Sequence, residues 1–303
     1  MTFWEDKRVL ITGCSGFIGR NMVDSIREKG GNPSLVSHAK PTFDTQGADV
    51  FVGGMEDESF SVWLTDRTFD VIYHLGGQTN KPLFTKEPTR VTASIMGGVS
   101  AIARYAHTRD THVIFPSAAS IYGNSSVVHP EDDIPCPRDV YGMAKLASER
   151  ILNAATANLT IMRISPSYGK YESLKGDHAS VITLFAKSIL AGKRPVIYGR
   201  GDQKRDFIYV QDVVDIMLEA AYEKKMGLYN VGTGLTYSLA EVAAKIAGAA
   251  EVKVQPVFLR NPNGTTSSEL IDVSRLHSWW GKPAISIDDG IKLTVDYVRG
   301  EKK

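Results

Sequence analysis

The fold is decided by RVLITGCSGFIG, the stretch at residues 8–19. Its first half is short, apolar and β-branched, which is typical of a buried parallel strand. Three glycines follow, and apolar residues then recur at helical spacing as far as the helix-stopping pair at 30–31. A strand, a glycine turn and a helix predict a dinucleotide-binding loop, where the helix N-terminus faces a diphosphate. The candidate cofactor-binding residues here are Gly13, Ser15, Gly16, Phe17, Ile18 and Gly19.

A second informative stretch is YGMAK at residues 141–145. Tyr141 and Lys145 are four residues apart, so on a helix they share one face, and Asp139 is placed to cap that helix. A nearby ammonium favours the phenolate, so we expect Lys145 to lower the pKa of Tyr141 from about 10. A phenol of lowered pKa suits proton transfer, which makes Tyr141 and Lys145 candidate catalytic residues.

Composition narrows the class of protein. The chain has 303 residues and a net charge of +1, which is room for one large or two modest domains. The balanced charge, with no long basic run, disfavours nucleic acid as a partner. We see no bilayer-spanning stretch and no signal-peptide pattern, so we expect no membrane partner. Cys14 and Cys136 are the only cysteines, and no metal-ligand spacing is visible; a metal-free protein of the reducing cytoplasm is expected.

Strand and helix patterns alternate up to about residue 165, which predicts an α/β fold with a doubly wound parallel sheet. We expect strands at 8–12, 34–37, 49–52, 70–75, 112–117 and 159–164, and helices at 17–29, 57–66, 92–107 and 139–157. Further helices are expected at 178–191, 211–224, 238–249 and 287–299. This pattern predicts a dinucleotide-binding domain at 1–165 and a smaller α/β substrate domain at 166–303, with the segment around 205–232 a candidate to return to the first.

Several runs resemble one family across nearly the whole chain. TGCSGFIG at 12–19 resembles the opening of the NAD(P)-dependent sugar-nucleotide epimerase/dehydratase branch of the extended short-chain dehydrogenases/reductases. Four further runs of this chain resemble other signatures of the branch: DVIYHLGG at 70–77, RDFIYV at 205–210, YNVGTG at 229–234 and WWGKP at 279–283.

The resemblance implies a Rossmann fold, bound NAD or NADP, and a nucleotide-sugar substrate. Tyr141 would be the acid/base, and Lys145 would also hold the nicotinamide ribose. Arg205 is a candidate diphosphate contact, because a guanidinium fork suits phosphate oxygens. Helices 92–107 and 139–157 would form a homodimer interface. Leu75, Gly76 and Gly77 would lie against the cofactor.

The chain departs from the family pattern in the segment SAASIYG at 117–123. The branch usually has Ser or Thr where this chain has Ala118, and that hydroxyl would bond the reacting sugar oxygen. A register shift would bring in Ser117, which is our candidate catalytic hydroxyl, and Ser120 is a candidate substrate contact. The position after Ala118 also lacks the Asp-Glu pair of sugar dehydratases, which argues against that reaction.

Further departures concern the cofactor and the sugar. The acidic residue expected after the second strand is missing; Ser37, His38 and Lys40 stand there and would suit a 2′-phosphate, so NADP and NAD stay open. Around the adenine contact after the third strand, the candidates are Met55 and Glu56. Pro166 replaces the usual Asn after the sixth strand, and Tyr168 is a nearby polar substitute.

The function that these features predict is a nucleotide-sugar epimerase of the 4-epimerase type. Tyr141 would move a proton while hydride passes transiently to the cofactor. Two alternatives remain open: an NADPH-dependent keto-sugar reductase and a non-catalytic cofactor-binding regulator. His74, at the end of a predicted strand, is interpreted as a packed residue rather than a catalyst.

Overall fold

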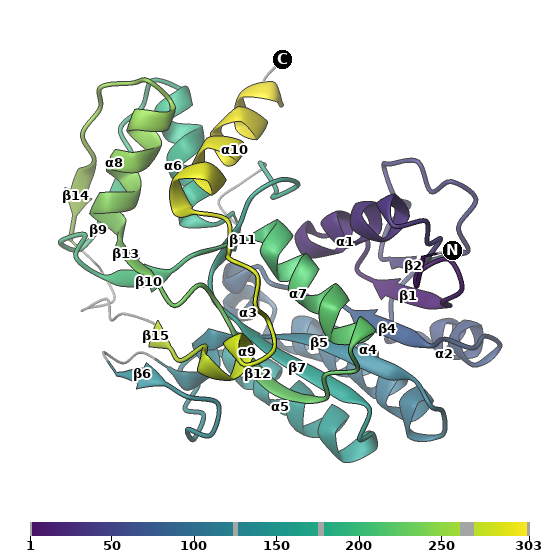
Figure 1. Ribbon diagram of the computed structural model, residues 1–303. Helices are drawn as coiled ribbons and strands as arrows, with labels where there is room; N and C mark the ends of the chain where they lie inside the picture. Colours follow the sequence, from purple (N-terminus) through teal and green to yellow (C-terminus); the bar gives the residue numbers. More distant parts are fainter. Residues whose placement is uncertain (1, 124–126, 175–178, 261–269, 302–303) are drawn as a thin grey trace. The chain divides into compact units, whose positions relative to one another are not determined.

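The computed structural model describes residues 2–123, 127–174, 179–260 and 270–301 (Figure 1). The chain divides into two compact units. The first comprises residues 1–121, 137–163 and 214–229, and the second comprises 122–136, 164–213 and 230–303. Whether these units coincide with folding domains divided at residue 165 stays a prediction.

A seven-stranded sheet carries the first unit, and only the last residues of two of its strands fall in the second. In spatial order its strands are β12 (Gly227–Val231), β7 (Leu159–Ile164), β5 (His112–Ala118), β4 (Val71–His74), β1 (Val9–Thr12), β2 (Ser34–Ser37) and β3 (Val50–Val52). The pairs β1–β2, β2–β3, β1–β4 and β4–β5 are all parallel. The six strands predicted for this part of the chain each match an observed strand to within one residue at either end.

Helices connect the strands of the sheet. They are α1 (Phe17–Glu28), α2 (Glu58–Thr65), α3 (Lys81–Lys86), α4 (Pro88–His107), α5 (Val140–Ala155) and α7 (Val210–Tyr222), with a short 3₁₀ turn, η1 (Ala119–Tyr122), after β5. Helices α4 and α5 run side by side (Figure 1). The sequence analysis missed α3, and it began α4 four residues late, although a proline at the first helical position is a recognised start signal.

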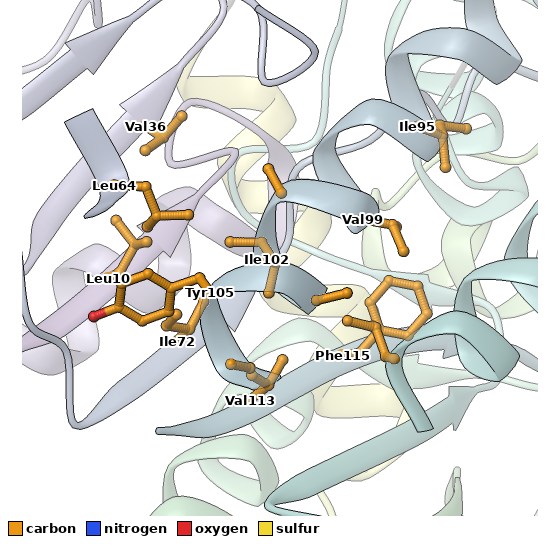
Figure 2. Close-up of a cluster of buried hydrophobic side chains, with 14 of the residues drawn as sticks. Leu10, Val36, Leu64, Ile72, Ile95, Val99, Ile102, Tyr105, Val113 and Phe115 are labelled. Carbon is orange, nitrogen blue, oxygen red and sulfur yellow. The ribbon is translucent and has the colours of Figure 1, made fainter. Parts of the chain in front are cut away.

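The core of the first unit lies where α2 and α4 cover one face of the sheet. Figure 2 shows Leu10, Ile72 and Val113 from neighbouring strands meeting Leu64 of α2 and Ile102 of α4. All five side chains are buried. Burying side chains of this size contributes about 1.5–3 kcal/mol each, so the ends of β1, β4 and β5 are held by a dense apolar layer.

The second unit contains short strands and four helices among the residues described. Its strands pair as β6 (Val128–His129) with β15 (Leu270–Ile271), β8 (Ser167–Tyr168) with β11 (Ile208–Tyr209), β9 (Val196–Tyr198) with β14 (Val257–Leu259), and β10 (Lys204–Asp206) with β13 (Thr236–Ser238). Its helices are α6 (Val181–Leu190), α8 (Leu239–Ala249), α9 (Ser274–His277) and α10 (Ile287–Gly300).

The four helices predicted after residue 165 match α6, α7, α8 and α10 to within three residues at either end, and the predicted start at residue 178 lies outside the described residues. Within the described part of the chain, no helix combines the length and the apolar character that crossing a bilayer requires.

Candidate functional site

The candidate site lies at the carboxyl ends of β1 and β4, where the strand order reverses. The chain passes from β1 to β2 and β3 on one side, and then returns to β4 on the other side of β1. Ligands of open α/β sheets bind outside the strand ends at such a point. Thr12 and His74 are register partners there, and their side chains share a hydrogen bond of 3.0 Å. The Thr12 hydroxyl oxygen also accepts from the Gly76 N–H at 2.9 Å, which joins the two loops.

The glycine loop that follows β1 has the close backbone approaches predicted for it. Gly13 has φ +68°, and a Cβ on it would lie 2.7 Å from Cα of Gly76. A Cβ on Gly19 would lie 2.1 Å from the Gly13 carbonyl oxygen, so helix α1 packs against the loop without room for a side chain. Gly16 is the N-cap of α1 and no side chain caps the helix. The first N–H groups of α1 therefore remain available for an anion, which fits a diphosphate.

The other predicted cofactor residues surround this loop in the first unit. The hydroxyls of Ser15 and Ser37 are 2.8 Å apart, so the end of β2 is tied to the glycine loop. Ser37 is buried, whereas His38 and Lys40 are exposed in the connection that follows β2. Phe17 and Ile18 begin α1 and are half-buried.

Met55 and Glu56 also lie beside the switch point. A Cβ on Gly76 would lie 2.5 Å from Cε of Met55, so the Met55 side chain covers the backbone of the β4 loop. Glu56 is exposed and accepts from the Ser94 hydroxyl at 3.2 Å. The structure thus gathers Met55 with the β4 loop and directs Glu56 toward α4. The remaining residues of the loop predicted for the cofactor, Leu75 and Gly77, follow β4 directly.

Tyr141 and Lys145 lie in the first turns of α5, and Asp139 caps the helix by accepting from the Gly142 N–H at 2.7 Å, as predicted. The Lys145 ammonium donates to the Pro116 carbonyl at 2.7 Å and lies 4.7 Å from the ring centroid of Phe115. Burial lowers the pKa of Lys145 to about 8, and the charge of Glu149 opposes that shift.

The expected lowering of the Tyr141 pKa is not found in the ligand-free chain. Burial raises the pKa of the phenol, and the negative charge of Asp139 raises it further. The sequence placed an ammonium one turn away but could not show how deeply the phenol is enclosed. The Tyr141 ring meets Phe84 edge-on at 5.6 Å, and that apolar contact is part of the desolvation.

Phe115 links the two halves of the site. The rings of His74 and Phe115 stack with 5.9 Å between their centroids. His74 lies in β4 and Phe115 in the neighbouring strand β5. His74 is 1% exposed, and burial, with a smaller effect of the Lys145 charge, lowers its pKa to about 3. The interpretation of His74 as a packed, neutral residue is therefore confirmed. Sequence reasoning missed Phe115, since an apolar residue within a strand carries no signal beyond burial.

The serines on either side of Ala118 are both enclosed. Strand β5 ends at Ala118 and the 3₁₀ turn begins at the next residue. The hydroxyls of Ser117 and Ser120 are inaccessible and have no hydrogen-bond partner among the residues that the structure describes. Unpaired buried hydroxyls are costly, so each is a candidate for a ligand contact.

Two predicted substrate residues belong to the second unit. Arg205 is half-buried in β10 and donates to the Lys204 carbonyl at 2.9 Å. Its neighbour Asp206 is buried and binds Thr233 through both the N–H and the hydroxyl, so the two residues do not form a surface pair. Tyr168 is fully buried, and a Cβ on Gly290 would lie 2.2 Å from its hydroxyl. The hydroxyl of Tyr168 has no hydrogen-bond partner among the described residues, and the substrate contact predicted for it stays a prediction.

A glycine loop at the switch point of a doubly wound sheet, joined through Thr12, His74 and Phe115 to a half-buried Tyr–Lys pair, defines a dinucleotide-dependent enzyme. No group of three or more side chains able to hold a metal ion occurs among the described residues. The chain belongs to the NAD dependent epimerase/dehydratase family, whose sequence pattern matches residues 9–232. The family and the fold predicted from the sequence are thereby confirmed.

Known proteins of similar length resemble the chain from end to end. A UDP-glucose 4-epimerase of Mycolicibacterium smegmatis is 30% identical, with 98% of this chain and 100% of the relative covered. The crystal structure of UDP-glucose 4-epimerase from Thermotoga maritima with UDP-glucose superposes with a TM-score of 0.89 at 26% identity, covering 98% and 100% of the two chains. UDP-glucose 4-epimerase of Thermus thermophilus in complex with NAD gives a TM-score of 0.84 at 25% identity, with 97% and 99% covered.

Proposed function

We propose that the chain is a NAD-dependent 4-epimerase of a nucleotide-linked sugar. The observation that carries the proposal is the half-buried pair Tyr141 and Lys145 in the unit that also holds the switch-point glycine loop. The full-length similarity to UDP-glucose 4-epimerases supports the same reaction. We also propose that the second unit, with Arg205, holds the nucleotide part of the substrate.

The first unit fits a nicotinamide dinucleotide. A bound dinucleotide supplies a ring that accepts a hydride from a sugar carbon and returns it. The uncapped N-terminus of α1 suits the diphosphate, and the tight glycine contacts keep side chains out of its path. The Lys145 ammonium has three N–H donors, and one of them binds the Pro116 carbonyl oxygen, so the others can hold ribose hydroxyls.

In this reaction Tyr141 takes the proton of the sugar hydroxyl and later gives it back. Because burial holds the phenol protonated, its ionisation requires positive charge nearby. The chain supplies that charge as the Lys145 ammonium, one turn along α5. Burial lowers the pKa of Lys145 to about 8, so the ammonium persists at neutral pH.

The assembly and setting of the enzyme are further parts of the proposal. We propose a homodimer formed through α4 and α5, which is supported by the exposed Val140 and Met143 on α5. Light scattering of the purified protein tests it. The free thiols of Cys14 and Cys136 support a reducing compartment such as the cytoplasm.

The decisive experiment is turnover of UDP-glucose and other UDP-sugars, with products separated by chromatography and cofactor identified by mass spectrometry. We expect the C4 epimers to interconvert with no net oxidation or reduction of the cofactor. We expect kcat of Tyr141→Phe to be lower than that of the wild type by about 100- to 10,000-fold. Full activity of Tyr141→Phe would falsify the mechanism.

A second candidate function is an NADPH-dependent keto-sugar reductase. It is favoured by the exposed His38 and Lys40 and by the missing acid after β2. Stoichiometric oxidation of added NADPH by a 4-keto sugar, with no epimer exchange, would select it. Cofactor binding without turnover of any sugar would instead select the non-catalytic regulator.

A further inference from the structure

We propose that Ser120 supplies the hydrogen bond to the reacting sugar oxygen that a residue at position 118 cannot give. The inference rests on the proposed function and concerns this chain's own departure from its family. Ala118 has a methyl group where the family pattern has a hydroxyl. A sugar oxygen that gives its proton to Tyr141 is stabilised by a separate hydrogen-bond donor, and in this chain that donor would be another side chain close by.

Burial separates the two candidate serines. Along the end of β5 and the turn η1, residues 117, 119 and 121 are buried, whereas Ala118 and Ser120 are half-buried. Residue 120 is therefore less deeply buried than residue 117, as is Ala118, although the hydroxyls of both serines are enclosed in the ligand-free chain. Ser117 is only 4% exposed and is therefore the more deeply buried of the two serines.

Position along the chain also favours Ser120. The 3₁₀ turn lies beyond the carboxyl end of β5, which is the edge where open α/β sheets bind their ligands. The turn lies against the first turn of α5, because a Cβ on Gly142 would lie 3.5 Å from the Ser120 carbonyl oxygen. Gly142 is the neighbour of Tyr141, so the backbone that carries Ser120 lies beside the backbone that carries the phenol.

The hydroxyl of Ser120 has the state that this role requires. It is inaccessible in the ligand-free chain and has no partner among the described residues. Leaving a buried hydroxyl without a partner is unfavourable, and a ligand oxygen that accepts from it would remove that cost. The turn thus holds a donor ready for a group that the chain itself does not contain.

The test compares three variants in the turnover assay and in sugar-binding calorimetry. We expect Ser120→Ala to lower kcat about 10- to 100-fold with a smaller change in KM, because the hydrogen bond strengthens as the proton leaves the sugar. Ser117→Ala tests the other candidate hydroxyl, and a loss of kcat larger than that of Ser120→Ala would assign the role to Ser117 and overturn the inference. Adding Ala118→Ser to Ser120→Ala should restore most of the lost rate.

The rescue distinguishes a direct role from a structural one, since a merely structural serine would not be replaced by a hydroxyl two residues away. Ser120→Thr keeps the hydroxyl and should retain activity, which guards against a loss caused by misfolding. Full activity of Ser120→Ala, or no rescue by Ala118→Ser in a variant that still binds the sugar, overturns the inference. If the wild-type enzyme turns over no sugar, the proposed function itself has failed, and that outcome is separate.

Discussion

Replacing Lys145 with methionine should make the protein more stable while abolishing its activity. The ammonium is enclosed beside Pro116 and Phe115, with no carboxylate in direct contact among the described residues. Burial without an ion-pair partner is expensive for a charge. Methionine has a similar length and no charge, so Lys145→Met removes that penalty and keeps most of the packing.

The magnitude follows from the pKa of Lys145. Its fall from 10.5 to about 8 means that the charged form costs the folded state about 3 kcal/mol relative to the neutral form. The variant also loses the hydrogen bond to the Pro116 carbonyl, which reduces the gain in stability by about 1 kcal/mol. We expect a net gain of about 2 kcal/mol near neutral pH, which for a chain of 303 residues corresponds to a rise in Tm of about 3 °C.

The pH dependence of stability tests whether the buried charge of Lys145 destabilises the folded state. The folded pKa of Lys145 lies below the unfolded value, so between about pH 8 and 10.5 the unfolded chain holds a proton that the folded chain has lost. The stability of the wild type must therefore rise with pH across that window, and Lys145→Met must lack this rise. Urea denaturation of both proteins, from neutral pH to the upper end of that window, measures the difference. A variant less stable than the wild type near neutral pH, or a difference independent of pH, would refute the reasoning.

Two further predictions concern buried polar groups of the first unit. Glu149→Gln should destabilise the protein by about 3–5 kcal/mol in urea denaturation, because Glu149 and Arg163, with side chains 5% and 4% exposed, form a two-pronged ion pair. Recovery of part of that loss when both residues are changed to Met would support this cause, and a neutral single variant would contradict it. The Thr160 hydroxyl donates to the Lys225 carbonyl at 2.6 Å and therefore accepts from Nε2 of His112 at 2.7 Å; burial lowers the pKa of His112 to about 4. The pKa of His112 is lower in the folded chain than in the unfolded chain, so up to about 3 kcal/mol of stability that is present above pH 6.5 is lost as the pH falls through 4. In acid denaturation, the stability of His112→Gln should therefore fall less steeply with decreasing pH than that of the wild type.

The elements of the first unit could be predicted because their patterns are local. The strand at 9–12 consists mainly of apolar, β-branched residues and is followed by glycine. Neighbouring residues therefore predict both that the segment is a strand and where it ends. Helix α3 was missed because six residues with a proline in the first turn show no apolar period. The paired short strands of the second unit escaped for a related reason: β14 and β9 have three residues each, and their partners are some sixty residues apart.

The candidate site was predicted as a set of residues, but not as an electrostatic environment. The spacing of Tyr141 and Lys145 placed them on one helix face, yet only the fold shows that both are enclosed. Enclosure reverses the expected direction for the phenol, because desolvation depends on residues distant in sequence, such as Phe84. The bond between Thr12 and His74, sixty-two residues apart, was invisible for the same reason.

The crowded backbone around the glycine loop limits which positions can be mutated to change the cofactor preference. Gly13 and Gly19 face backbone atoms too closely for even a methyl group, so randomising them would produce mostly misfolded chains. His38 and Lys40 are exposed in a connection outside this crowded zone and tolerate new side chains. A small mutant library confined to that connection would sample nucleotide selectivity while the folded scaffold stays intact.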